Sequence, residues 1–173
     1  MDLNNFVRDI PDFPKPGIVF KDITPVLASA EALDAAVAQL AAATRDLKVD
    51  VVIGAEARGF LLGAALAREL GAGFVLARKP GKLPHETVRA EYLLEYGTDA
   101  LELHTDAVAQ GARVLVHDDL LATGGTARAL CELVEQLEGV VVGCAFLIEL
   151  GFLGGRSKLA GYDVSSVLRY DAE

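Results

Sequence analysis

Two carboxylates and a glycine-rich turn stand together in the middle of the chain, and their chemistry suits a sugar phosphate. Asp118 and Asp119 follow directly after Val114–Val116, an aliphatic run that predicts a buried strand. The turn comes next and leads into a helix predicted over Ala127–Leu137. Backbone N–H groups and the helix dipole at such a turn attract phosphate, while acceptor-only carboxylates suit the vicinal hydroxyls of a ribose 5-phosphate. The turn consists of Ala122, Thr123, Gly124, Gly125 and Thr126.

An ordinary strand–turn–helix connection would explain the two glycines alone. It would not explain why a hydrophobic strand, two aspartates, the glycine-rich turn and a helix follow one another in this order. A Walker A loop is excluded because no lysine follows the glycines. A strand, paired aspartates and Ala-Thr-Gly-Gly-Thr in one run closely resemble the 5-phosphoribosyl-1-pyrophosphate (PRPP) binding motif of type I phosphoribosyltransferases. His117 stands where that motif more usually has an aliphatic residue. As the last residue of the predicted strand, it should have little effect on phosphate binding.

Two further segments carry cations that a polyphosphate ligand would need. Arg58 lies in Ala55–Gly59, a predicted strand-to-helix loop. A cation at a helix start is unfavourable for the helix dipole, so a functional role is the better explanation for Arg58. Arg78, Lys79 and Lys82 gather positive charge around a Pro-Gly turn. The alternatives are a solvated arginine at a helix start and a solvated run of charges. In an acidic protein, a polyphosphate partner is the better explanation for both segments.

Residues 85–110 interrupt the rhythm of alternating strands and helices and predict an antiparallel ribbon. Thr87–Tyr96 and Ala100–His104 read as its two strands, with a turn at residues 96–99. Glu95 lies near the predicted tip, where a mobile hairpin could carry a catalytic acid or base. The alternative is an exposed surface glutamate before a turn.

The composition describes a globular protein and disfavours several functional classes. The chain has 173 residues, of which 52% are hydrophobic, enough for one domain with its own core. Its net charge of −9 disfavours a nucleic-acid or membrane-surface role. No run reaches the roughly 18 apolar residues of a membrane span, and the N-terminus lacks the regions of a signal peptide, so we expect a cytoplasmic protein. Cys131 and Cys144 lack disulfide or zinc spacing and should be buried free thiols.

The remaining pattern predicts the elements that position these residues. Prolines punctuate residues 1–25 and predict an extended arm, with a short strand-like piece at Ile18–Phe20. The alternation that follows predicts an α/β fold, a mostly parallel Rossmann-like sheet flanked by helices, in a single domain over residues 1–173. The predicted helices are Ala30–Leu47, with Ser29 as N-cap, and Phe60–Leu70, with a short helix within residues 150–159. The other predicted strands are Val49–Gly54, Gly73–Ala77, Gly139–Ile148 and Val164–Arg169.

Four motifs spread over nearly the whole chain resemble the adenine phosphoribosyltransferase family, in that family's order and spacing. They are Phe13–Pro25, Glu56–Phe60, Arg78–Pro84 and Leu94–Gly97. The resemblance implies the type I phosphoribosyltransferase fold, with a flexible ribbon lid at residues 85–110 and an N-terminal arm or hood at residues 1–25. It also implies a purine salvage reaction in which adenine and PRPP give AMP and pyrophosphate, with Mg²⁺, in a homodimer.

The same resemblance implies roles for individual residues. Glu95 would be the catalytic carboxylate, which takes the N9 proton of adenine or stabilises charge on the purine, with Tyr96 beside it in the closed lid. The turn at residues 122–126 would hold the 5-phosphate, and Asp118 and Asp119 the ribose hydroxyls, directly or through hydrated Mg²⁺. The residues at the pyrophosphate would be Glu56, Ala57, Arg58, Arg78, Lys79 and Lys82. The residues at adenine would be Val19 through its backbone, Phe20 as an apolar wall, Lys21, where the family often has arginine, and Arg58.

Two other functions stay open at this point. Another type I enzyme, acting on hypoxanthine, guanine, xanthine or orotate, would share the fold and the PRPP site. A PRPP-sensing regulator that binds nucleic acid would keep the fold, but it needs an added domain or a basic surface. The acidic composition argues against the regulator.

Overall fold

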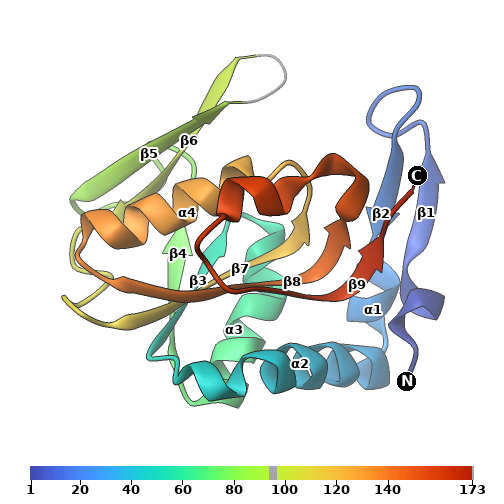
Figure 1. The fold of residues 1–173 in the computed structure, drawn as a ribbon, viewed down its shortest axis with the longest axis horizontal. Helices are drawn as coiled ribbons and strands as arrows, with labels where there is room; N and C mark the ends of the chain where they lie inside the picture. Colours follow the sequence, from blue (N-terminus) through green and yellow to red (C-terminus); the bar gives the residue numbers. More distant parts are fainter. Residues whose placement is uncertain (94–96, 173) are drawn as a thin grey trace.

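A five-stranded parallel sheet forms the centre of the computed structural model, which describes residues 1–93 and 97–172 (Figure 1). The strand order is β4-β3-β7-β8-β9, and every neighbouring pair is parallel. The predicted helix-flanked parallel sheet is therefore confirmed. The strands are β3 (Val51–Ala55), β4 (Gly73–Ala77), β7 (Arg113–Leu121), β8 (Val140–Leu150) and β9 (Val164–Tyr170).

Helices cover both faces of this sheet and bury one hydrophobic core on each face. On one face α4 packs with η4, and on the other lie α1, α2 and α3 (Figure 1). The first core contains the fully buried Leu130 and Phe146, and the second contains Leu66 and Leu115. The helices are α1 (Thr24–Ala28), α2 (Ala30–Thr44), α3 (Arg58–Leu70) and α4 (Gly125–Gln136), with the 3₁₀ helices η1 (Leu3–Phe6), η2 (Arg45–Leu47), η3 (Gly151–Leu153) and η4 (Gly155–Leu159).

Local capping signals set two helix ends as the sequence predicts. The Ser29 hydroxyl accepts a hydrogen bond from the Ala32 N–H at 3.2 Å and begins α2. The α-helical hydrogen bonds of α2 end at Thr44, and η2 continues to the predicted end at Leu47. Gly71 ends α3 with a positive φ of 68°.

The central strand β7 is longer than its sequence predicts. The prediction ended the strand at His117 and placed Asp118 and Asp119 directly after it, but β7 continues to Leu121 and both are strand residues. The 11 residues of β8 supply backbone partners along this length, a non-local pairing that overrides the poor strand preference of aspartate. Helix α4 likewise begins at Gly125 rather than Ala127, so the last part of the predicted turn is the first turn of the helix.

Two antiparallel strand pairs extend from the central sheet (Figure 1). One pair is the N-terminal arm, β1 (Arg8–Pro11) with β2 (Val19–Asp22), and the other is the predicted ribbon, β5 (Thr87–Leu93) with β6 (Thr98–His104). The ribbon is confirmed, although β6 begins within the predicted turn and residues 94–96 lie outside the described part. The sequence missed η1 and also α1, which begins at the end of the arm because proline is tolerated in a first helical turn.

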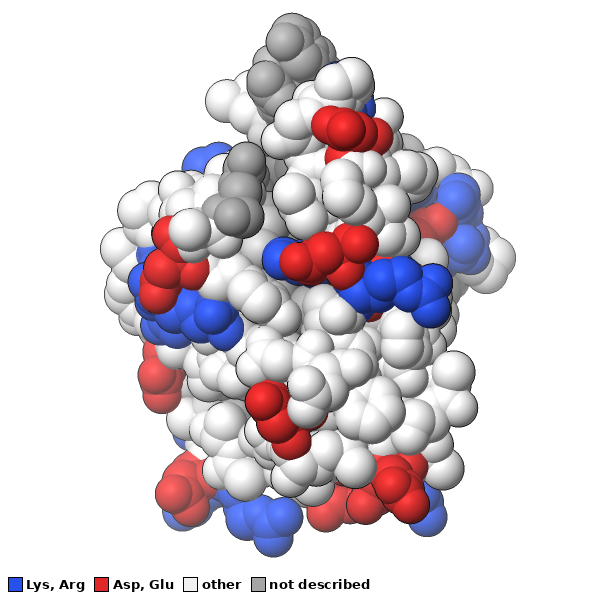
Figure 2. Space-filling model, turned by 90° about the vertical axis from the view of Figure 1, so that its right-hand side faces the viewer, with Lys and Arg blue, Asp and Glu red and all other residues white. Residues whose placement is uncertain are grey.

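Charged side chains on the arm side of the molecule are mixed in sign. Figure 2 shows lysines and arginines lying next to aspartates and glutamates on this face. One such pair joins Arg8 to Asp22 at 3.5 Å. Within residues 1–93 and 97–172, the structure contains no helix that combines the length and the apolar character of a membrane span.

Candidate active site

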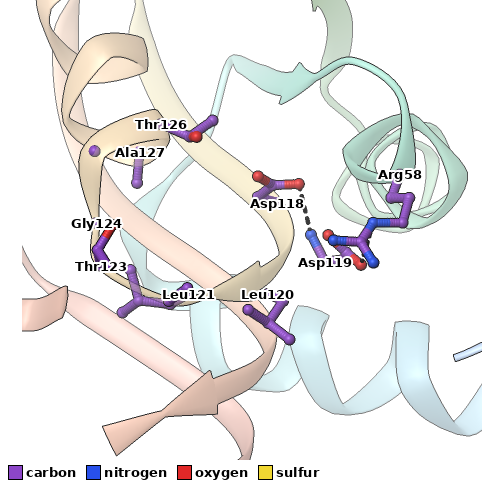
Figure 3. A pocket seen from close by; sticks show the side chains of 11 residues that line it. Arg58, Asp118, Asp119, Leu120, Leu121, Thr123, Gly124, Thr126 and Ala127 are labelled. Carbon is purple, nitrogen blue, oxygen red and sulfur yellow. Dashed lines mark hydrogen bonds and ion pairs between the residues drawn. The ribbon is translucent and has the colours of Figure 1, made fainter. Parts of the chain in front are cut away.

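The glycine-rich turn forms one wall of a pocket next to the end of β7 (Figure 3). Gly124 has a φ of +84°, which favours glycine, and a Cβ there would lie 2.5 Å from the backbone oxygen of Gly155. A Cβ on Gly155 would in turn lie 2.3 Å from the carbonyl oxygen of Ala122. The turn and η4 therefore pack backbone against backbone. The first turn of α4, whose N–H groups have no intrahelical acceptor, lines the same pocket.

The two aspartates of β7 line this pocket and leave an acceptor oxygen unused. The Asp119 N–H donates a hydrogen bond to Asp118 Oδ1 at 2.9 Å. Asp119 is 2% exposed, and its Oδ2 has no hydrogen-bond partner among the described residues. Burial raises the pKa of both carboxyl groups, and the adjacent charge of Asp119 raises the pKa of Asp118 further. The pair therefore suits a ligand that brings hydroxyl donors or a cation.

Arg58 begins α3 and connects the aspartates with the N-terminal arm. Its Nε lies 3.2 Å from Asp119 Oδ2, an ion pair without hydrogen-bond geometry that Figure 3 shows at the edge of the pocket. Its guanidinium also lies 5.1 Å from the centre of the Phe20 ring, a cation–π contact. Phe20 packs edge to face with Phe13 at 5.2 Å. Val19 and Phe20 lie on β2, and Phe20 connects to the pocket through Arg58, which lines it.

Glu56 hydrogen-bonds the basic turn to the loop that carries Arg58. Its Oε2 accepts hydrogen bonds from the Lys79 N–H at 2.8 Å and from Arg78 Nε at 3.3 Å, and its Oε1 accepts one from the Lys82 ammonium. Burial raises the pKa of Glu56, but these hydrogen bonds outweigh it and lower the pKa to about 2. The structure therefore brings together Glu56, Ala57 and the three basic residues of the turn, with the acid at the centre.

Lys79 joins the basic turn to the ribbon. Its ammonium donates to Asp99 and, at 3.1 Å, to the Tyr92 hydroxyl. Burial lowers the pKa of Lys79, but its hydrogen bonds to Asp99 and Tyr92 outweigh it and raise the pKa. The backbone of Arg78 also pairs with Glu102 of β6, at 2.9 and 2.7 Å. The loop of Glu56, the basic turn and the ribbon therefore form one connected unit.

Lys21 was also predicted to lie at adenine, but its ammonium contacts Asp9 and Tyr170 and is not paired with Arg58 or Phe20 among the described interactions. Its ammonium lies 2.7 Å from an Asp9 carboxylate oxygen and 4.2 Å from the centre of the Tyr170 ring. Successive residues of a strand point to opposite sides, so Phe20 and Lys21 on β2 face different neighbours.

The predicted catalytic residue Glu95 and its neighbour Tyr96 lie outside the described residues. The last described residue of β5, Leu93, has its carbonyl oxygen 3.5 Å from where a Cβ on Gly125 would lie. The end of β5 is therefore beside the glycine-rich turn at residues 122–126.

Sequence reasoning missed several residues that shape the site. Asp99 was assigned to a turn, but it lies on β6 opposite Tyr92, and only the register of the ribbon brings both to Lys79. Gly155 belongs to a glycine-rich stretch that gave a signal for a tight turn, but no signal for contact with Gly124.

Comparisons with known proteins agree with this arrangement. A family model described as phosphoribosyl transferase domain matches residues 23–167. The adenine phosphoribosyltransferase of Rubrobacter xylanophilus is 63% identical over 169 residues, which cover 97% of this chain and 91% of that protein. The solved structure of adenine phosphoribosyltransferase from Thermoanaerobacter pseudethanolicus has a TM-score of 0.95 at 56% identity, covering 97% of this chain and 98% of that one.

A more distant relative was solved with ligands. The Saccharomyces cerevisiae adenine phosphoribosyltransferase, complexed with D-2,5-dideoxy-2,5-imino-altritol 1,6-bisphosphate and adenine, has a TM-score of 0.91 at 41% identity, covering 96% of each chain. Family model, relatives and fold all agree with the resemblance that the motifs indicated. The chain therefore belongs to the phosphoribosyltransferase family and, within it, to the adenine phosphoribosyltransferases.

Proposed function

We propose that this site transfers the 5-phosphoribosyl group of PRPP to adenine, giving AMP and pyrophosphate in purine salvage. The observation that carries the proposal is the position of Arg58, which lies 3.2 Å from Asp119 and 5.1 Å from the centre of the Phe20 ring. The sugar-phosphate side and the base side of the site thus share one residue. The yeast relative, solved with adenine and an imino-altritol bisphosphate, supports a site with these two halves.

Each half of the substrate pair has its own group of residues. The N–H groups of the turn at residues 122–126 and the dipole of α4 would hold the 5-phosphate. Asp118 and Asp119 would accept hydrogen bonds from the ribose hydroxyls, which gives the unused Asp119 oxygen a partner. Adenine would stack against the Phe20 ring and meet the backbone of Val19.

Catalysis would depend on charge compensation at both ends of the broken bond. The sugar C1 gains positive charge as pyrophosphate leaves, and Arg58, Arg78, Lys79 and Lys82 would neutralise the leaving group. Glu95 would accept the N9 proton of adenine or stabilise the charge on the purine, with Tyr96 beside it in the lid. Exclusion of water by the ribbon would protect PRPP from hydrolysis.

Mg²⁺ fits this site as a partner of PRPP rather than as a metal held by the protein alone. The described residues contain no cluster of three or more metal-ligating side chains. Asp118 and Asp119 offer two carboxylates, and a buried oxygen of Asp119 accepts no hydrogen bond from the described residues. Mg²⁺ commonly binds through one or two carboxylates together with substrate phosphates and water, and when bound it would add positive charge near the pyrophosphate.

We also propose that the protein is a cytoplasmic homodimer that needs neither nucleic acid nor a membrane. Leu61 on α3 and Leu76 on the edge strand β4 are 50% and 42% exposed, and exposed apolar side chains of this kind support a protein interface. Cys131 and Cys144 are buried and free, as predicted, with sulfurs 3.7 Å apart, which supports a reducing compartment. Size-exclusion chromatography with light scattering tests the dimer, and a monomer at working concentration would contradict it.

The reaction is tested by incubating the protein with PRPP, Mg²⁺ and one base at a time. We expect AMP from adenine and no nucleotide from hypoxanthine, guanine, xanthine or orotate. Nucleotide formation from another base instead of adenine would favour the first rival, and binding to a promoter or leader RNA without turnover would favour the regulator.

The role of Glu95 has its own test. Glu95→Gln should cut turnover by roughly 10² or more and leave substrate binding largely intact. Glu91→Gln is the matched control, because Glu91 lies on the same ribbon and pairs only with Arg89, at 3.1 Å, among the described residues. Near-normal turnover in Glu95→Gln would remove the assignment.

A further inference from the structure

The charged side chains proposed for pyrophosphate are all basic except Glu56. A carboxylate at hydrogen-bond distance from pyrophosphate would repel it. Glu56 nevertheless lies in the same loop as Arg58, and its side chain is only 11% exposed. Its presence at the site therefore needs a reason other than direct contact with the ligand.

The contacts of Glu56 supply that reason. Both carboxylate oxygens are used, and all three donors come from the basic turn: the Lys79 N–H, Arg78 Nε and the Lys82 ammonium. The N–H of Glu56 itself donates to the Ala77 carbonyl at 2.9 Å, which fixes the loop to the end of β4. Glu56 thus joins two loops that follow neighbouring strands, β3 and β4.

Two of the side chains that donate to Glu56 can still bind a ligand. Arg78 and Lys82 have side chains that are 34% and 48% exposed. Arg78 contacts Glu56 through Nε alone among the described interactions, so its terminal nitrogens stay available. A ligand could therefore bind these side chains while Glu56 holds them in place.

We propose that Glu56 is a positioning residue that holds the side chains of Arg78 and Lys82, and the backbone of Lys79, against the pyrophosphate loop. The charges of Arg78 and Lys82 are then in place before pyrophosphate binds. The inference rests on the proposed function and deepens it, because it assigns the acid of that loop a role through the cations. The low pKa of Glu56, about 2, keeps the carboxylate ionised at any working pH. The alternative role is that of a counter-ion that competes with pyrophosphate for the same cations. In that role, loss of the Glu56 charge would strengthen pyrophosphate binding.

Glu56→Gln separates the two roles. Positioning predicts that the variant binds inorganic pyrophosphate, with Mg²⁺ present, about tenfold more weakly in calorimetry, and that the KM for PRPP rises by a similar factor. The KM for adenine should change less than about twofold, because Arg58 contacts Phe20 and Asp119, and no interaction among the described residues joins Arg58 or Phe20 to the basic turn. Tighter pyrophosphate binding would overturn the proposal in favour of competition. An equal rise in both KM values would overturn it in favour of general damage.

The matched control is Glu69→Gln. Glu69 lies on α3, 51% exposed, and pairs with Arg45 at 3.7 Å, so the substitution makes the same charge change and also loses an ion pair. It should leave pyrophosphate binding unchanged, and a tenfold loss there would refute a specific role for Glu56.

A double-mutant cycle with Lys82→Met tests whether Glu56 acts through the cations. In the Lys82→Met background, Glu56→Gln should weaken pyrophosphate binding clearly less than in the wild type, and full additivity would contradict the mechanism. If Glu56→Gln does not fold, Glu56→Asp, which keeps the charge on a shorter side chain, replaces it with a smaller expected loss in the same direction. A wild-type protein that binds pyrophosphate but forms no AMP would refute the proposed reaction and leave the test of Glu56 valid.

Discussion

Lowering the pH from 7 to 5 should destabilise the fold through His117. This side chain is fully buried in β7, and its Nδ1 lies 2.9 Å from the Ala145 carbonyl oxygen. A carbonyl only accepts hydrogen bonds, so Nδ1 carries the proton, and Nε2 has no partner among the described residues. Burial lowers the pKa of His117 from 6.5 to about 4, although the hydrogen bond to Ala145 opposes the shift.

The sign and the size of the effect follow from this lowered pKa. Below pH 6.5 the unfolded chain binds a proton at His117 while the folded protein does not, so stability is complete above pH 6.5 and falls as the pH drops toward 4. Each pH unit in this window removes about 1.4 kcal/mol from the free energy of unfolding. Between pH 7 and pH 5 the expected loss from His117 is about 2 kcal/mol.

Urea unfolding at pH 7 and pH 5 measures this loss, with His117→Leu as the reference that cannot titrate. The wild type should lose about 2 kcal/mol more than His117→Leu over this interval, at similar m-values. His85→Gln, which removes a histidine with a 57% exposed side chain, should keep the wild-type pH dependence. Equal losses in the wild type and His117→Leu would refute the reasoning.

Three further substitutions test the site and its support. Gly124→Ala should raise the KM for PRPP at least about tenfold, because its Cβ would lie 2.5 Å from the Gly155 oxygen. Gly71 also has a positive φ but open space around it, so Gly71→Ala should cost about 1 kcal/mol of stability and leave that KM unchanged. Asp118→Asn should raise the urea midpoint at pH 7, because burial and Asp119 raise the pKa of Asp118 and its ionised form destabilises the fold, while PRPP binding measured by calorimetry becomes weaker. Glu149→Gln should lower the free energy of unfolding by about 2 kcal/mol in urea titrations, because it breaks a buried carboxylate's paired hydrogen bonds to Arg156, at 2.7 and 2.8 Å. An unchanged KM for PRPP in Gly124→Ala, an unchanged urea midpoint in Asp118→Asn or an unchanged free energy of unfolding in Glu149→Gln would contradict the corresponding contact.

The features that the sequence predicted well are those that local chemistry decides. An apolar strand and a glycine-rich turn occur within a few neighbouring residues at positions 114–126, so each can be read without knowledge of the fold, although α4 begins two residues before the predicted start. The N-cap at Ser29 belongs to the same class. The length of β7 does not, because its last residues become strand only by pairing with β8.

The features that the sequence could not predict depend on register and on long-range contact. Asp99 and Tyr92 meet Lys79 only because β5 and β6 pair in one particular register. His117 gave no sign of its burial between the sheet and α3, where the position of a Cβ on Gly63 would lie 3.3 Å from its ring. The different surroundings of Phe20 and Lys21, in contrast, follow from strand periodicity, and that signal was present in the sequence.

The backbone contact between Gly124 and Gly155 makes residues 151–159 sensitive to substitution, although they touch no proposed substrate. No side chain of residues 151–159 is assigned to a substrate, so a catalogue of ligand contacts would treat substitutions there as neutral. Yet η4 packs directly against the glycine-rich turn at residues 122–126, and Arg156 ties η4 to Glu149 of β8. Substitutions in this segment should therefore raise the KM for PRPP, although the altered residue lies about 30 positions further along the chain than the turn that it supports.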